Sequence, residues 1–166
     1  MFLQSILLKQ LILTCEEDGM LAQMNAWDRA NAASTQLSHP NVLKLLATCF
    51  EPTLIASLFE GTTGATLNDL MKSKRCKWKD LSMLPVAEGI ASGMEYIQGT
   101  TNKPHGHLCP SNVLFSLSYQ VKIASAGEDR CWSKDYIATS HAGSFCYLSP
   151  SVLKGEASTL KDDVYR

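Results

Sequence analysis

The sequence predicts an α+β domain, because short apolar runs alternate in mixed order with two longer stretches of helical period. The runs of strand length are 6–13, 42–50, 54–59, 113–115 and 120–124. The helical stretches are about 19–37 and a second one that starts near residue 80. A chain of 166 residues is long enough for one domain with a hydrophobic core and too short for two full ones.

Composition and charge indicate an ordinary globular protein. Hydrophobic residues make up 45% of the chain and charged residues 19%, which argues against disorder. The formal net charge of −1 gives no overall attraction to nucleic acid, so we expect none as a partner. Six cysteines without C-x-x-C spacing favour free thiols, and no apolar run approaches the ~18 residues of a membrane span. We expect a location in the cytoplasm or on the cytoplasmic face of a membrane protein.

The first strand and the first helix follow from local patterns. The run at 6–13 is apolar around Lys9 and suits a mostly buried strand. Acidic residues at 16–18 favour a helix start, and the helix has an inward stripe that becomes small at Ala30 and Ser34. The sequence His-Pro-Asn at 39–41 ends this helix.

The middle of the chain contains a turn, a capped helix and a basic loop. Glycines break the apolar pattern at 61–64, and Thr66 followed by Asp69 predicts a capping box. The helix from residue 80 has an apolar stripe made of Leu84, Ala87, Ile90, Met94 and Ile97. A basic loop surrounds Trp78 and contains Lys72, Lys74, Arg75, Lys77 and Lys79. This loop either binds an anion or acidic partner or is a plain solvated loop.

Several ordered motifs resemble those of protein kinases. Residues 105–114 read HGHLCPSNVL and resemble the catalytic loop, H-R-D-L-K-P-x-N-V-L. Residues 121–127, VKIASAG, are similar to V-K-I-x-D-F-G, and residues 143–151, GSFCYLSPS, to the activation-segment end G-T-x-x-Y-M-A-P-E. Residues 161–165, KDDVY, resemble K-S-D-V-Y, and 39–42, HPNV, fit the turn after the regulatory helix. Several such motifs in order are a strong signal.

The resemblance implies a partial two-lobed protein kinase-like fold. Residues 1–60 correspond to part of the N-lobe, and residues 61–166 to part of the C-lobe. The Gly-rich strand pair and the C-terminal helices of a kinase domain have no counterpart in this sequence. The Tyr147 pattern leans toward serine/threonine or tyrosine-kinase-like members, whereas His105–Leu108 is also similar to the H-G-N-L of receptor guanylyl cyclase kinase-homology domains.

The resemblance also implies that the phosphotransfer residues are degenerate. His107 stands at the catalytic-loop aspartate and Cys109 at the neighbouring lysine, while Ser125 replaces the aspartate of D-F-G. Asn112 remains at the other metal-ligand position, but an amide without its carboxylate partner should hold Mg²⁺ weakly. We therefore expect no intact catalytic residue and at most weak binding of ATP and Mg²⁺.

The nucleotide-binding positions upstream are altered too. Lys9 corresponds to the strand lysine that grips ATP phosphates, although it also fits a surface lysine on an edge strand. Its helix partner, a glutamate in kinases, is Ala30, and Leu7 stands where a small alanine usually contacts adenine. The packing column of active kinases corresponds to Ser34, Leu45, His105 and Ala126. Alanine in place of phenylalanine there should weaken the active arrangement.

These features predict a pseudokinase that acts as a scaffold or allosteric partner of other proteins, such as an active kinase or cyclase domain in the same or another chain. Two alternatives are a weak, unconventional ATP-dependent protein kinase with His107 as base and a non-functional fragment of a larger kinase-like protein. A third is a zinc site made of His105, His107 and Cys109. Regulatory phosphorylation would fall in the activation-segment region, on Ser133, Tyr136, Thr139, Ser140 or Ser144.

Overall fold

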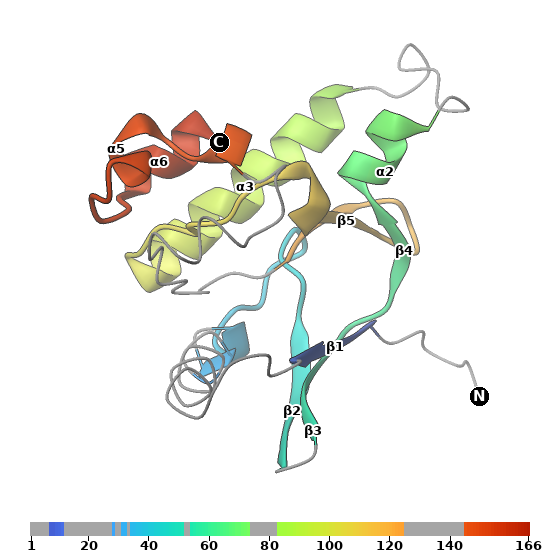
Figure 1. Ribbon diagram of the computed structural model, residues 1–166. Coiled ribbons are helices and arrows are strands. Elements are labelled where there is room, and N and C mark those ends of the chain that lie inside the picture. Colours follow the sequence, from blue (N-terminus) through green and yellow to red (C-terminus); the bar gives the residue numbers. More distant parts are fainter. Residues whose placement is uncertain are drawn as a thin grey trace, which may run out of the picture.

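The computed structural model describes residues 7–11, 28, 31–32, 34–51, 54–73, 83–124 and 145–166. Its described strands form two three-stranded sheets. In the first sheet β3 (Leu54–Phe59) lies between β1 (Leu7–Leu11) and β2 (Leu45–Glu51), and both pairings are antiparallel. Figure 1 shows this sheet at the bottom of the view and the helices α3, α5 and α6 at the top. The strands predicted at 6–13 and 54–59 are therefore confirmed.

The strand predicted over 42–50 is partly wrong, because its first residues pair elsewhere. Val42 forms a parallel bridge with Ile123 in the second sheet. The Leu43 N–H donates to the Ile123 carbonyl at 2.8 Å, and the Ile123 N–H donates to the Asn41 carbonyl at 2.8 Å. β2 begins only at Leu45, so a single apolar run serves both sheets.

The second sheet has the order β4-β5-β6. β5 (Val113–Ser116) and β6 (Val121–Ile123) form the predicted antiparallel hairpin. The break predicted at 61–64 is wrong, because β4 (Thr62–Thr66) pairs with β5. Gly64 has a φ of 76°, at an irregularity in the register of that pairing, and such a positive φ is accessible to glycine at no steric cost. A glycine in a strand thus marks a bulge here instead of ending the strand.

The capping box at Thr66 is confirmed. The Thr66 Oγ1 accepts the Asp69 N–H at 3.1 Å, and an Asp69 carboxylate oxygen accepts the Thr66 N–H at 2.9 Å. These reciprocal bonds satisfy two N–H groups that a helix start otherwise leaves unpaired. They begin the short helix α2 (Leu67–Lys72), which contacts β4 and β5.

The long helix α3 (Met83–Thr101) confirms the predicted element but corrects its inward face. Ile97 and Met94 are buried as expected, whereas Leu84 is 66% exposed and Ala87 is also exposed. Val86, Gly89 and Gly93 are buried in their place. The reason is close approach: a Cβ on Gly93 would lie 2.8 Å from both the Asn41 carbonyl oxygen and the Ile123 Cδ1. Because a hydrophobicity pattern gives glycine little weight, the stripe was placed about one residue step away.

Of the helix predicted at 19–37, residues 28, 31–32 and 34–35 are described, and all are helical. The remaining described helices are short: η1 (Pro110–Asn112), η2 (Phe145–Tyr147), α5 (Pro150–Leu153) and α6 (Leu160–Tyr165). Within the described ranges, no helix is long and apolar enough to cross a membrane.

Two buried apolar clusters connect the first sheet and its neighbouring turn to the second sheet. One cluster joins Leu37 and Val42 to Met94, Ile97 and Ile123. The other consists of Leu43, Leu45, Phe59, Leu114 and Ala124. A third cluster packs α2 and α3 on the second sheet and contains Leu67, Val86, Val113, Phe115 and Val121. The core is therefore continuous around the residues that precede and follow the catalytic-loop-like segment.

Candidate functional site

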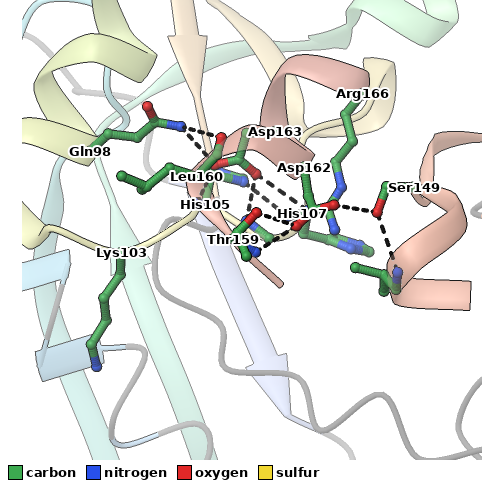
Figure 2. Close-up of polar contacts among 12 residues, drawn as sticks. Gln98, Lys103, His105, His107, Ser149, Thr159, Leu160, Asp162, Asp163 and Arg166 are labelled. Carbon is green, nitrogen blue, oxygen red and sulfur yellow. Dashed lines mark hydrogen bonds and ion pairs between the residues drawn. The ribbon is translucent and has the colours of Figure 1, made fainter. Parts of the chain in front are cut away.

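The segment that resembles a catalytic loop, residues 105–112, joins α3 to β5 and is held from below by α6. The His105 N–H donates to Asp163 Oδ2 at 2.7 Å, and the Gly106 N–H donates to Asp163 Oδ1 at 3.0 Å. Gln98 on α3 donates its Nε2 to the same carboxylate at 2.9 Å (Figure 2). Asp163 is 5% exposed, so these bonds form away from water and are strengthened by the low local dielectric.

His105 is a buried structural histidine. Its side chain is 1% exposed, and its Nε2 donates to the Ala124 carbonyl at 3.1 Å. Its Nδ1 accepts the His107 N–H at 3.2 Å, and this pair of bonds assigns the proton to Nε2. Both ring nitrogens are thus engaged with the backbone, which opposes the zinc alternative. Among the residues with described positions, no group of three His, Cys, Asp or Glu side chains could hold a metal ion.

His107, Cys109 and Asn112 lie on the same loop, as the sequence predicted. The Asn112 Nδ2 donates to the His107 carbonyl at 2.8 Å, and the Asn112 N–H donates to the Cys109 carbonyl at 2.9 Å. The Ala124 N–H donates to the Asn112 carbonyl at 2.9 Å, which fixes the end of β6 beside the loop. The amide N–H of Asn112 therefore braces the loop backbone. Ser125 and Ala126 lie outside the described residues.

Lys9 lies on β1 directly opposite Ser57 of β3. The Ser57 side chain is buried, and its Oγ donates to the Asn31 Oδ1 at 2.8 Å. A neutral hydrogen bond therefore joins the helix to the centre of the first sheet, one residue beyond the predicted partner position Ala30. The side chains of Lys9 and Leu7 are outside the description, as is Ala30, so their roles in nucleotide binding stay predictions.

A charged contact that the sequence did not predict ties the two sheets together. Lys122 on β6 and Glu60, just after β3, form an ion pair at 2.7 Å between Nζ and Oε1. The same oxygen accepts the Lys44 N–H at 2.9 Å. Lys122 is 9% exposed, so its charge is largely removed from water and needs this partner. No local pattern marks such a pair, because its members are 62 positions apart.

Asp162, next to Asp163 on α6, holds the end of the activation-segment-like region. Its Oδ1 accepts hydrogen bonds from the hydroxyls of Ser149 and Ser151, the latter at 2.9 Å. Its Oδ2 accepts the Thr159 N–H at 2.6 Å and the Thr159 hydroxyl at 2.7 Å. These bonds, that from Ser149 above all, hold the pKa of the Asp162 carboxyl well below its usual range.

This arrangement predicts a loss of stability in acid. The folded-state pKa of Asp162 lies below its unfolded value of about 3.9, so its stabilisation is fully present above that value and is lost as the pH falls toward the folded pKa. Urea unfolding at several pH values between about 5 and 2 should show a steeper fall in unfolding free energy for wild type than for Asp162→Asn. Glu156→Gln, a change at an exposed carboxylate, should keep the wild-type slope. Equal slopes for wild type and Asp162→Asn would contradict this assignment.

The residues that organise this site were mostly missed from sequence. Asp162 and Asp163 fall inside the KDDVY motif, which was a signal for an element and not for a role. Gln98 and Asn31 carry no signal of their own. Beyond Lys72, which is exposed at the end of α2, the predicted basic loop lies outside the described residues. The predicted phosphorylation positions Ser133, Tyr136, Thr139, Ser140 and Ser144 also lie outside them.

Comparison with known proteins identifies the family. The family model for protein tyrosine and serine/threonine kinases matches residues 5–166. A probable serine/threonine-protein kinase of Dictyostelium discoideum is 33% identical over 131 residues, which cover 79% of this chain and 14% of that protein. The seven transmembrane domain-containing tyrosine-protein kinase 1 of the same organism is 34% identical over 134 residues, 78% of this chain and 19% of that protein. Wall-associated receptor kinase-like 4 of Arabidopsis thaliana is 30% identical over 139 residues, 78% of this chain and 18% of that protein.

The chain spans less than a fifth of the length of these relatives. The family match covers all the motifs on which the resemblance was based, from the turn at residue 39 to the helix that ends at Tyr165. Its two small sheets and its helices fit a partial kinase fold. The chain belongs to the protein tyrosine and serine/threonine kinase family.

Proposed function

We propose that this chain is a catalytically inactive protein kinase-like domain that acts as a protein-interaction or allosteric scaffold. The observation that carries the proposal is the contrast within residues 105–112. The backbone of this loop is held by Asp163 and Asn112, while its two reactive positions carry an imidazole at His107 and a thiol at Cys109. A loop that keeps its anchors and lacks its carboxylate suits a binding role.

The donor set does not fit the Mg²⁺–nucleotide complex that kinases use. Asn112, His107 and Ser125 offer an amide, an imidazole and a hydroxyl, whereas Mg²⁺ prefers charged oxygen ligands. The Asn112 N–H group is already bonded to the His107 carbonyl, which leaves only its carbonyl oxygen for a metal. We therefore propose no phosphoryl-transfer step through these residues.

The expected partners are other proteins, among them an active kinase or cyclase domain in the same or another chain. The support is that a hydrogen-bonded regulatory helix, anchored through Asn31 and Ser57, requires no nucleotide to stay on the sheet. A scaffold needs a persistent shape, and this contact supplies part of it without an ion pair to Lys9.

The test is thermal unfolding of the purified chain with and without ATP and Mg²⁺, combined with incorporation of radiolabelled phosphate from ATP. We expect a cooperative melt that nucleotide leaves unchanged, because only a ligand that binds the folded state raises its stability. We also expect no incorporation above that of a heat-denatured sample.

Two other outcomes would contradict the proposal. Phosphate incorporation that disappears in Asn112→Ala would identify an unconventional kinase that uses the residual metal position. The matched control is Asn102→Ala, an exposed asparagine after α3, which should not change any incorporation. The absence of a cooperative melt would favour the non-functional fragment instead.

A further inference from the structure

Arg166, the residue after α6, places a guanidinium group against the catalytic-loop-like segment. Its side chain is 1% exposed, and its Nη1 lies 3.4 Å from Asp163 Oδ1. In Figure 2 this side chain points toward the loop that carries His107. Cys109 is also close enough to Arg166 to interact with it electrostatically. A positive charge thus lies at a loop whose own two basic positions, by the motif above, are Gly106 and Cys109.

Half of this guanidinium has no protein partner. The Nε and Nη2 atoms are buried, and neither makes a hydrogen bond within the part of the chain that the structure describes. The nearest carboxylates do not supply one. Asp163 is shared among Nη1 and the donors of His105, Gly106 and Gln98, and Asp162 is occupied by three hydroxyls and a backbone N–H. Leaving charged donors buried and unpaired is strongly unfavourable, so a partner is expected.

The free edge has the geometry of an oxyanion site. Nε–H and Nη2–H of an arginine point in parallel and match two oxygens of a phosphate group. Next to the guanidinium, Gly106 has a φ of 75° and carries no side chain. A Cβ built there would meet only Arg166 Nη1 within 4 Å, at 3.8 Å, which leaves open space beside the charge.

We infer that the Nε–Nη2 edge of Arg166, beside Gly106, binds a phosphate group. The phosphate is either free inorganic phosphate or a phosphoryl group on a side chain of this chain. This site is separate from the nucleotide position around Lys9, and the inference does not rest on the proposed loss of phosphotransfer.

The experiment is a titration of the whole chain with inorganic phosphate, followed by calorimetry. Intact mass before and after phosphatase treatment first shows whether a phosphoryl group is attached. An unmodified wild-type chain should bind one phosphate saturably. Arg166→Lys, which keeps the charge and loses the fork, should bind at least ~10-fold more weakly, a difference of ~1.4 kcal/mol. Lys161→Met, an exposed change on the same helix, should bind like wild type.

Each outcome decides the inference. If the purified chain carries a phosphoryl group and binds free phosphate only after phosphatase treatment, the covalent source is supported. Absence of saturable binding by the unmodified chain, or equal binding by wild type and Arg166→Lys, would overturn the inference. Loss of binding in Lys9→Met with none in Arg166→Lys would place the phosphate in the nucleotide position and overturn it too. If Arg166→Lys does not fold, the arginine Nε–H resonances of wild type decide: a protected one must shift with phosphate, and no shift overturns the site.

Discussion

Replacing Asp163 with alanine is expected to lower the free energy of unfolding by about 3–5 kcal/mol. The carboxylate is 5% exposed and accepts the N–H groups of His105 and Gly106, the Gln98 amide and the Arg166 guanidinium. Alanine would leave all four donors without this acceptor, and the buried arginine would lose its ion-pair partner. Urea unfolding followed by circular dichroism measures the loss.

The matched control for this prediction is Asp69→Ala, which removes an exposed aspartate from the α2 capping box. It should be much less destabilising, because water replaces the lost hydrogen bonds of an exposed group. Amide hydrogen exchange adds a local measurement: protection of the His105 and Gly106 N–H groups should fall in Asp163→Ala and persist in Asp69→Ala. Equal stability losses in the two variants would show that Asp163 does not anchor the loop.

Two glycines of α3 should respond to alanine with opposite signs. In Gly93→Ala the new Cβ would lie 2.8 Å from the Asn41 carbonyl oxygen and from Ile123 Cδ1. The Asn41 backbone cannot easily move away, because its carbonyl accepts the Ile123 N–H at 2.8 Å and its side chain donates to the Val121 carbonyl at 3.1 Å. Overpacking of about 1–3 kcal/mol outweighs a gain in helix propensity of up to about 1 kcal/mol, so we expect a net loss of about 1–2 kcal/mol.

Gly99→Ala is the control on the same helix. Nothing lies within 4 Å of a Cβ at this position, so only the helix propensity changes. The variant should be stabilised by about 0.5–1 kcal/mol. Thermal or urea unfolding of both variants against wild type measures the two signs. A Gly93→Ala variant as stable as Gly99→Ala would mean that α3 does not pack closely on residues 41 and 123.

Much of the secondary structure could be predicted because its causes are local. The Thr66–Asp69 capping box and the hairpin at 113–123 depend on residues a few positions apart. The errors arose where a distant partner decides. Val42 leaves its apolar run to pair with Ile123, and Thr62–Thr66 becomes a strand because β5 offers an edge.

The candidate site shows the same division. The positions of His107, Cys109 and Asn112 on one loop followed from the kinase-like motif, and the structure brings them together there. The anchors of that loop could not be predicted, because Gln98, Asp163 and Arg166 act through contacts across the fold. A buried hydrogen bond has no signature in the sequence around either partner.

By itself the sequence determined the family, the order of most elements and the loss of the acidic phosphotransfer residues, since each depends on residue identity along the chain. Only the tertiary structure decided which face of α3 is buried, which carboxylate holds the loop and where the Arg166 charge lies. The physical reason is that burial and pairing are properties of surfaces in contact. At Gly93 a missing side chain allows that contact, and at Asp163 a single carboxylate collects donors from three separate segments.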